Sequence, residues 1–157
     1  MATLKHPITP SLWLNADVKK AAKFYVSVFP NSKIVSVSTI HDTPDGDCEV
    51  VLFKLSGQPF WAFGPNKHFK FNESLSLMVL CDTQKEIDYY WKKLSDQPKL
   101  AQCGWLKDKF GVSWQITPSF MSKVMSEGSP AQIDRAMQAL MKMKKIDLAT
   151  IKKAYRG

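Results

Sequence analysis

The sequence predicts an α+β fold made of two related modules and a helical C-terminal extension. Residues 12–29 align with residues 77–94 at an offset of 65 residues, so that Asp17 falls on Asp82. Each copy contains a short alternating strand, an acidic helix start and an amphipathic helix, and each is followed by a W-x-x-x-P pattern. Internal repetition of this kind indicates repeated supersecondary units. We therefore expect paired βαβββ modules over residues 1–118 (about 8–65 and 74–118) and helices over residues 119–157.

In the first module, apolar and polar residues alternate at the start, as in a strand with one buried face. Asn15 or Asp17 then caps a helix that runs to about Phe29. β-Branched residues and turn residues predict a further strand and a hairpin that reverses at Ser56-Gly57. The strands are expected over residues 8–14, 35–41, 49–55 and 59–64.

The second module repeats this order, and the extension is helical to its end. We expect strands over residues 74–80, 100–107 and 112–117 and a helix over residues 83–95. Ser129 is a predicted N-cap, because proline and a capping-box glutamine follow it at the usual spacing. Asp147 is the expected cap of the last helix. The predicted buried stripe of the preceding helix is Ile133, Ala136, Met137, Leu140 and Met141.

Composition argues against several classes of protein. No apolar run approaches the roughly 20 residues that a membrane helix needs, and the N-terminal residues lack the apolar core of a signal peptide. The three cysteines are an odd number at unrelated spacings, which argues against a disulfide framework and a zinc motif. We expect reduced thiols, a cytoplasmic protein and no membrane partner.

The net charge of +8 is concentrated in the extension. Residues 119–157 carry eight Lys and Arg and three acids, whereas residues 1–118 carry fourteen and eleven. The basic residues of the extension alternate with apolar ones at helical spacing. This distribution favours a solvated helix face over a nucleic-acid site, because net charge by itself gives only nonspecific attraction.

Five segments of the chain together resemble a known family: Thr9–Trp13, Phe24-Tyr25, Phe71–Leu77, Gly104–Gln115 and Met143–Asp147. They are similar to the PhnB-like branch of the vicinal oxygen chelate superfamily, which includes glyoxalase I, bleomycin-resistance proteins and extradiol dioxygenases. The resemblance implies paired modules that form a curled mixed sheet around a pocket, and a homodimer. This branch also carries the name 3-demethylubiquinone-9 3-methyltransferase domain. The seven glycines form no G-x-G pair, so the glycine-rich turn of a Rossmann-type methyltransferase is missing.

Active members of the superfamily hold a divalent ion with His and Glu on the first and last strand of each module. The resemblance puts these positions at Thr9, Ala62, Ser74 and Gln115. None of the four is an imidazole or a carboxylate, and neutral hydroxyl and amide groups alone bind Zn, Fe or Mn poorly. We therefore expect no metal and no other cofactor.

Side chains alternate between the two faces of a strand, so the same register predicts one polar face. A polar sheet face in contact with water and a small pocket with hydrogen-bonding walls fit this pattern equally well, and the resemblance favours the pocket. The candidate ligand-binding residues on this face are Thr9, Ser11, Trp13, Ser74, Ser76, Met78, Ser113, Gln115 and Thr117.

Other chemistry-bearing residues have simpler interpretations. His68 is the one histidine whose loop could reach a pocket mouth, and a solvated loop residue is the more ordinary reading. Cys103 is expected as a small buried hydrophobe, since no histidine neighbours it. Asp108 precedes Gly111 in a tight turn and is expected to bond its own backbone.

The leading hypothesis is a metal-independent small-molecule-binding protein that forms a homodimer. Two alternatives stay open at this point. One is a metal-dependent lyase, isomerase or oxygenase of the same superfamily. The other is a structural or interaction protein that acts through the basic, methionine-rich extension.

Overall fold

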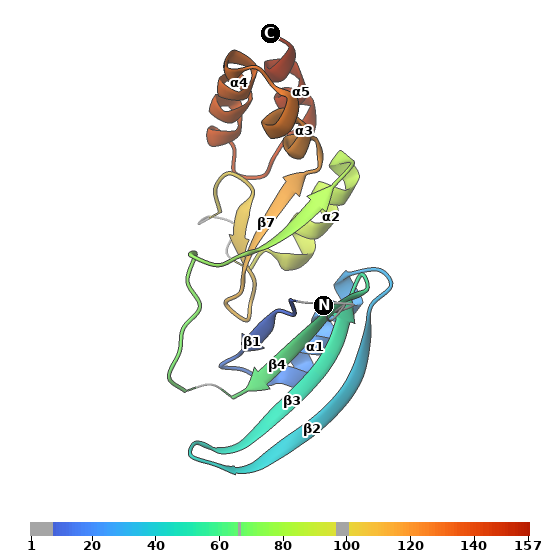
Figure 1. Cartoon of the computed structure of the whole chain (residues 1–157), viewed down its shortest axis with the longest axis vertical. Coiled ribbons are helices and arrows are strands. Elements are labelled where there is room, and N and C mark those ends of the chain that lie inside the picture. The colour runs from blue at the N-terminus through green and yellow to red at the C-terminus, as the bar shows by residue number, and fades with distance from the viewer. Residues whose placement is uncertain (1–7, 66, 97–100) are drawn as a thin grey trace, which may run out of the picture. The chain divides into compact units, whose positions relative to one another are not determined.

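The predicted α+β architecture is confirmed: the described residues form two mixed sheets, of four and three strands, and five helices (Figure 1). The structure is a computed structural model that describes residues 8–65, 67–96 and 101–157. The chain divides into two compact units, Met1–Lys70 and Phe71–Gly157. The helical extension therefore belongs to the same unit as the second module.

The first unit is a complete βαβββ module. Its elements are β1 (Ser11–Trp13), α1 (Val18–Val28), β2 (Lys33–Thr43), β3 (Gly46–Leu55) and β4 (Gln58–Gly64). The strand order is β1-β4-β3-β2, with β1 parallel to β4 and the other pairs antiparallel. Helix α1 covers one face of this sheet through an aromatic stack, in which the Tyr25 ring lies 6.3 Å from Phe53 and Phe53 lies 5.4 Å from Phe60. The opposite face of this sheet, which α1 does not cover, is the uncovered face.

The start of each module helix was predicted within one residue. Asp17 caps α1 by accepting a hydrogen bond from the Lys20 amide, at 2.9 Å. In the second module Thr83, rather than the aligned Asp82, is the N-cap of α2 (Gln84–Leu94), and it forms a capping box with Glu86. A threonine hydroxyl and the returning glutamate satisfy two helix amides together, which a single preceding aspartate does not.

The second unit begins with β5 (Leu77–Cys81), α2, β6 (Trp105–Lys107) and β7 (Ser113–Pro118). The strand order is β5-β7-β6, with β5 parallel to β7. Strand β6 is much shorter than the predicted strand over residues 100–107, and residue 100 lies outside the described residues.

The reason for the short strand is a local reversal at Cys103 and Gly104, which both have positive φ (54° and 83°). Their amides donate to the carbonyls of Met143 and Lys144, each at 2.8 Å, instead of to a neighbouring strand. A Cβ on Gly104 would lie 2.8 Å from Ile146 Cδ1 and 2.9 Å from the Ile116 carbonyl. Glycine is thus required here both for its backbone conformation and for space.

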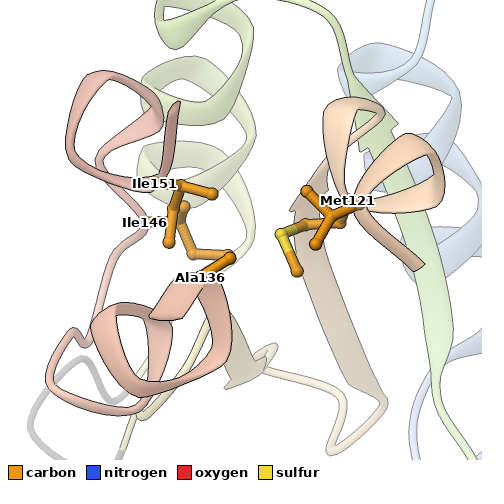
Figure 2. Packing of buried hydrophobic residues seen from close by; sticks show 5 residues of the cluster. Met121, Ala136, Ile146 and Ile151 are labelled. Carbon is orange, nitrogen blue, oxygen red and sulfur yellow. The ribbon is translucent and has the colours of Figure 1, made fainter. Parts of the chain in front are cut away.

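The extension folds into α3 (Phe120–Glu127), α4 (Pro130–Met141) and α5 (Leu148–Arg156). The predicted caps Ser129 and Asp147 are confirmed, the first within a capping box. These helices share an apolar core, and Figure 2 shows the Met121 side chain pointing toward those of Ala136, Ile146 and Ile151. The prediction was wrong for Met141, which is 65% exposed because α4 ends there.

Hydrogen bonds join the extension to the second module. Gln84 of α2 donates to the Ile146 carbonyl at 3.1 Å and accepts from the Leu148 amide at 2.8 Å. Lys145 also forms an ion pair with Asp88, at 2.5 Å. Among the helices of the described ranges, none is long and apolar enough to cross a bilayer.

Candidate functional site

The two sheets show that the W-x-x-x-P patterns are not structurally equivalent. Leu12 of β1 pairs with Ala62 of β4, whereas the corresponding Leu77 of β5 pairs with Trp114 of β7. Ala62 is therefore the counterpart of Trp114, and it is fully buried on the helix-covered face. The predicted placement of Ala62 at a ligand position was wrong by one residue, and a shift of one residue moves a side chain to the other face of a sheet.

In the first unit, the predicted polar face is largely aromatic. Ser11 and Trp13 project from β1 on the uncovered face, where Ser11 pairs with Trp61 and Trp13 pairs with Phe63. Thr9 precedes the strand and is half-buried.

In the second unit, the central predicted residues do come together. Gln115 and Thr117 project from the uncovered face of β7, and Met78 of the parallel neighbour β5 lies directly opposite Gln115. The Gln115 amide nitrogen donates to the Ser76 hydroxyl at 2.8 Å. Ser74 instead lies in an exposed turn, where its backbone amide donates to the Asn72 side chain at 3.0 Å.

A pocket of about 290 Å³ lies over this uncovered face. Gln115 and Thr117 of β7 and Trp105 of β6 are its polar residues, and helices α3 and α4 contribute methionine side chains. The methionine-rich sequence of the extension predicts an adaptable packing surface, and in the structure four of its methionines line this pocket. The other lining residues are Cys103, Met121, Met125, Met137, Leu140, Met141 and Ile146.

A second cavity of about 450 Å³ lies in the same unit, around the turn between β6 and β7. Ser113 lines it and is only 2% exposed, yet its hydroxyl has no hydrogen-bond partner among the described residues. The side chains of Glu73 and Lys107 form an exposed ion pair at 2.5 Å that also lines the cavity, as do Asp96 and Lys109. The sequence prediction placed Ser113 on the polar face but could not show that it is buried.

The buried carboxylate of Asp108 has the structural role that the sequence predicts. Its Oδ1 atom accepts from the amides of Phe110 (2.8 Å) and Val112 (3.1 Å). Its Oδ2 atom accepts from the indole nitrogen of Trp114 at 2.8 Å, a contact that the sequence did not indicate. Asp108 therefore fixes the turn at the rim of the second cavity and is not poised as a proton donor.

Among the residues that the structure describes, the cysteines and histidines do not assemble a catalytic group. Burial raises the pKa of the Cys81 thiol to about 12, and the carboxylates of Glu86 and Asp82 act in the same direction. This thiol stays protonated and unreactive at neutral pH. His41 and His68 each lie 2.8 Å from a carboxylate in the β2–β3 hairpin region of the first unit, those of Asp47 and Asp45.

A sequence profile of the 3-demethylubiquinone-9 3-methyltransferase family matches residues 6–117. The chain belongs to this PhnB-like family. It is 33% identical to a PhnB protein from Bacillus cereus named for the same methyltransferase, with a TM-score of 0.60 over 73% of this chain and all of that one. The match to the family ends before α3, so the helical extension lies outside it.

More distant structures share only the fold. Protein PA1353 from Pseudomonas aeruginosa is 18% identical, with a TM-score of 0.56, over 71% of this chain and 96% of that one. The fosfomycin resistance protein FosX from Listeria monocytogenes is 14% identical, with a TM-score of 0.50, over 81% and 98%. These two likenesses show a shared fold alone, whereas the predicted membership of the PhnB-like family is confirmed by the family match. No curated protein matches the chain.

The side chains at the expected metal positions do not fit a divalent cation. Gln115, one of these four positions, is neutral and already donates a hydrogen bond to Ser76. Two acids of the same unit are committed elsewhere, Glu73 to Lys107 and Asp108 to three N–H donors. Among residues 8–65, 67–96 and 101–157, no three His, Cys, Asp or Glu side chains gather into a possible metal site. Zn, Fe and Mn require imidazole, thiolate or carboxylate ligands, and this donor set supplies none.

The methyltransferase part of the family name does not follow from this fold. A Rossmann-type methyltransferase binds its cofactor at a glycine-rich turn between the first strand and helix of a mainly parallel sheet. Here the corresponding connection between β1 and α1 is Leu14-Asn15-Ala16-Asp17, and most strand pairs are antiparallel. Membership of the PhnB-like family therefore identifies the fold of this chain and does not by itself indicate methyltransferase activity.

Proposed function

We propose that this PhnB-like protein binds a small, largely apolar organic molecule without a metal ion, in the methionine-lined pocket of its second unit. One observation carries the proposal: at the centre of the uncovered sheet face, Gln115 takes the place of the usual acidic ligand. Its amide is held by Ser76 at the edge of an apolar pocket. An amide fixed in this way can orient a neutral ligand but supplies no charge to a cation.

The polar groups of the pocket support a ligand with both donor and acceptor groups. The amide oxygen of Gln115, the hydroxyl of Thr117 and the indole N–H of Trp105 have no hydrogen-bond partner among the described residues. A few polar groups within a mostly apolar lining are typical of small-molecule sites. The methionine side chains can adapt to an irregular ligand, because they have three rotatable bonds and a polarisable sulfur.

Binding is tested by calorimetry against a library of apolar metabolites and drugs. Thr117→Val removes one pocket hydroxyl at nearly constant volume, and we expect it to weaken binding several-fold. Thr39→Val, on the exposed surface of β2, is the matched control and should change nothing. A library without a single binder would contradict the proposal.

The metal-dependent alternative predicts a different result. Elemental analysis of protein purified without chelators should find less than a tenth of an equivalent of Zn, Ni, Mn or Fe. A stoichiometric metal, together with ligand binding that EDTA abolishes, would replace our proposal by the metalloenzyme alternative.

We also propose that the protein is a cytoplasmic homodimer. Exposed apolar side chains on the uncovered sheet faces support an interface, with Met78 and Leu80 of β5 both more than half exposed. The three cysteines are free, as expected in a reducing compartment. Sedimentation equilibrium should report the dimer mass, and a monomer at micromolar concentration would refute this assembly.

A further inference from the structure

We propose that the ligand is an amphiphile, with a zwitterionic head in the second cavity and an unbranched alkyl chain in the methionine-lined pocket. This inference rests on the proposed binding function and names its ligand class. It follows from two observations. The two cavities share a lining residue, and charged side chains line one of them whereas mostly apolar side chains line the other.

The two cavities lie along one face of one strand. Trp105 lines both of them, the second cavity contains Ser113, and the methionine-lined pocket contains Gln115 and Thr117. These three residues of β7 alternate with the buried Trp114 and Ile116, so their side chains share the uncovered face. The distance from Ser113 to Thr117 along a strand is about 13 Å. A ligand with a small head and a chain of six carbons matches this length.

The second cavity has the chemistry of a zwitterion site. Its charged side chains include acids (Glu73 and Asp96) and lysines (Lys107 and Lys109), so it offers partners to both an ammonium and a carboxylate. The buried Ser113 hydroxyl lacks a hydrogen-bond partner within the described ranges and can donate to the carboxylate. Buried hydroxyls are normally hydrogen-bonded, so an unpaired one that lines a cavity indicates a missing partner.

Access of the head group requires little rearrangement. The ion pair between Glu73 and Lys107 is exposed to solvent on both sides. Exposed pairs of this kind contribute little to stability, so its two charges can pair with a ligand instead. The Asp108 carboxylate keeps its three N–H donors and holds the turn in place while this exchange occurs.

The methionine-lined pocket offers no charged partner to the head group. Its helix-borne lining consists of Met121, Met125, Met137, Leu140 and Met141, all without charge. Placing a charged head there would cost its desolvation with no compensating ion pair. The polarity of the two cavities therefore fixes the orientation of an amphiphile along β7.

The inference is tested by calorimetry with L-alanine, L-2-aminohexanoate and L-2-aminooctanoate. We expect affinity to rise about fourfold for each added methylene, as for burial in apolar surroundings. Octylamine and octanoate each lack one charge of the head and should bind at least about tenfold more weakly than L-2-aminooctanoate, since each forfeits charge-assisted hydrogen bonds.

Two serines provide a matched pair of variants. Ser113→Ala should weaken L-2-aminooctanoate about tenfold by removing a hydrogen bond to its carboxylate, and it should leave 1-heptanol binding unchanged. Ser95→Ala removes the other buried unpaired hydroxyl of the described residues, which lines neither cavity, and should change neither ligand.

The outcomes separate this inference from the proposed function. If 1-heptanol binds as tightly as L-2-aminooctanoate, the head site is refuted while the apolar pocket stands. If the amino acids bind without dependence on chain length, the link between the two cavities is refuted. If no member of the series binds, the ligand class is wrong, and the library screen alone decides the proposed function.

Discussion

The buried contact between Asp108 and Trp114 predicts a strong energetic coupling. In Asp108→Asn, the amide oxygen can keep the position of Oδ1 and the bonds from the Phe110 and Val112 amides. The new NH₂ group then faces the indole N–H of Trp114, which lay 2.8 Å from Oδ2. Two donors cannot bond each other. Turning the amide over would only move the conflict to the two backbone amides.

The size of the effect follows from the bonds that are lost. A hydrogen bond to a charged group contributes about 1.5–3 kcal/mol, and a buried donor left unpaired costs about 1–3 kcal/mol. We expect Asp108→Asn to lower the free energy of unfolding by about 3 kcal/mol. Trp114→Phe alone should cost a similar amount, because it leaves Oδ2 without the indole donor and creates a void.

The double variant distinguishes this explanation from general disruption of the turn. With phenylalanine at position 114, no indole N–H opposes the new NH₂ group of Asp108→Asn. The combined cost should therefore fall short of the summed single costs by about 1–2 kcal/mol, which exceeds the deviation seen for independent sites. Urea unfolding followed by far-ultraviolet circular dichroism measures all four proteins. Additivity within about 0.5 kcal/mol would refute the direct contact.

Four further predictions concern packing, thiol reactivity, alkaline stability and metals. Gly104→Ala should be at least about 1 kcal/mol more destabilising than Gly111→Ala, the typical cost of overpacking. Both glycines have positive φ, but only at Gly104 would an added Cβ meet a close neighbour. Equal losses of unfolding free energy in urea would contradict this prediction. Cys81 should resist iodoacetamide at pH 8 in the folded protein while the other two cysteines react, so that mass spectrometry finds two labels before unfolding and three after. Because the folded pKa of Cys81 is raised from 9.0 to about 12, its contribution to stability is complete below pH 9 and is lost as the pH rises toward 12; a cysteine-to-alanine variant at this position should lose that part of the alkaline destabilisation. EDTA should leave the thermal unfolding temperature unchanged, and a shift of several degrees would contradict the metal-free interpretation.

The sequence predicted best those features whose causes are local. The caps at Asp17, Ser129 and Asp147 depend on a side chain and an amide two or three residues away, so a short window contains the whole signal. The turn at Asp108 is of the same kind. Repetition of the strand–helix pattern was also sufficient to predict the fold. An offset that aligns the apolar residues of the two copies also aligns the strands and helices that carry them.

The register of a strand needed information that the sequence pattern lacks. The repeated W-x-x-x-P pattern aligned Trp61 with Trp114, whereas pairing with the neighbouring strands aligns Ala62 with Trp114. A tryptophan fits either a buried or an uncovered sheet face. The shared residue type therefore did not indicate on which face each tryptophan side chain lies. Only the partner strand decides the face, and that partner lies about 50 residues away in the first unit.

The apolar lining of the pocket was not predicted, for a related reason. Its methionines lie on α3 and α4, outside the part of the chain that matches the family, and they meet β7 only through tertiary packing. The burial of Ser113 likewise depends on the surroundings of its strand rather than on its neighbours in sequence. Sequence reasoning could place Gln115 and Thr117 on the correct face but could not show which surface covers them.

The neutral pair formed by Gln115 and Ser76 makes different demands on the fold from a set of metal ligands. Carboxylates that converge on one point repel each other, so a metal site built from them is stabilised when the cation binds and is coupled to folding. The pair formed by Gln115 and Ser76 is uncharged and satisfies itself through a hydrogen bond of 2.8 Å. The centre of this sheet face can therefore form without a cation and at any pH between the titration ranges of acids and lysines. A binding site of this kind is preorganised by its own hydrogen bond, and its affinity should depend on the apolar surface that the ligand buries rather than on metal supply.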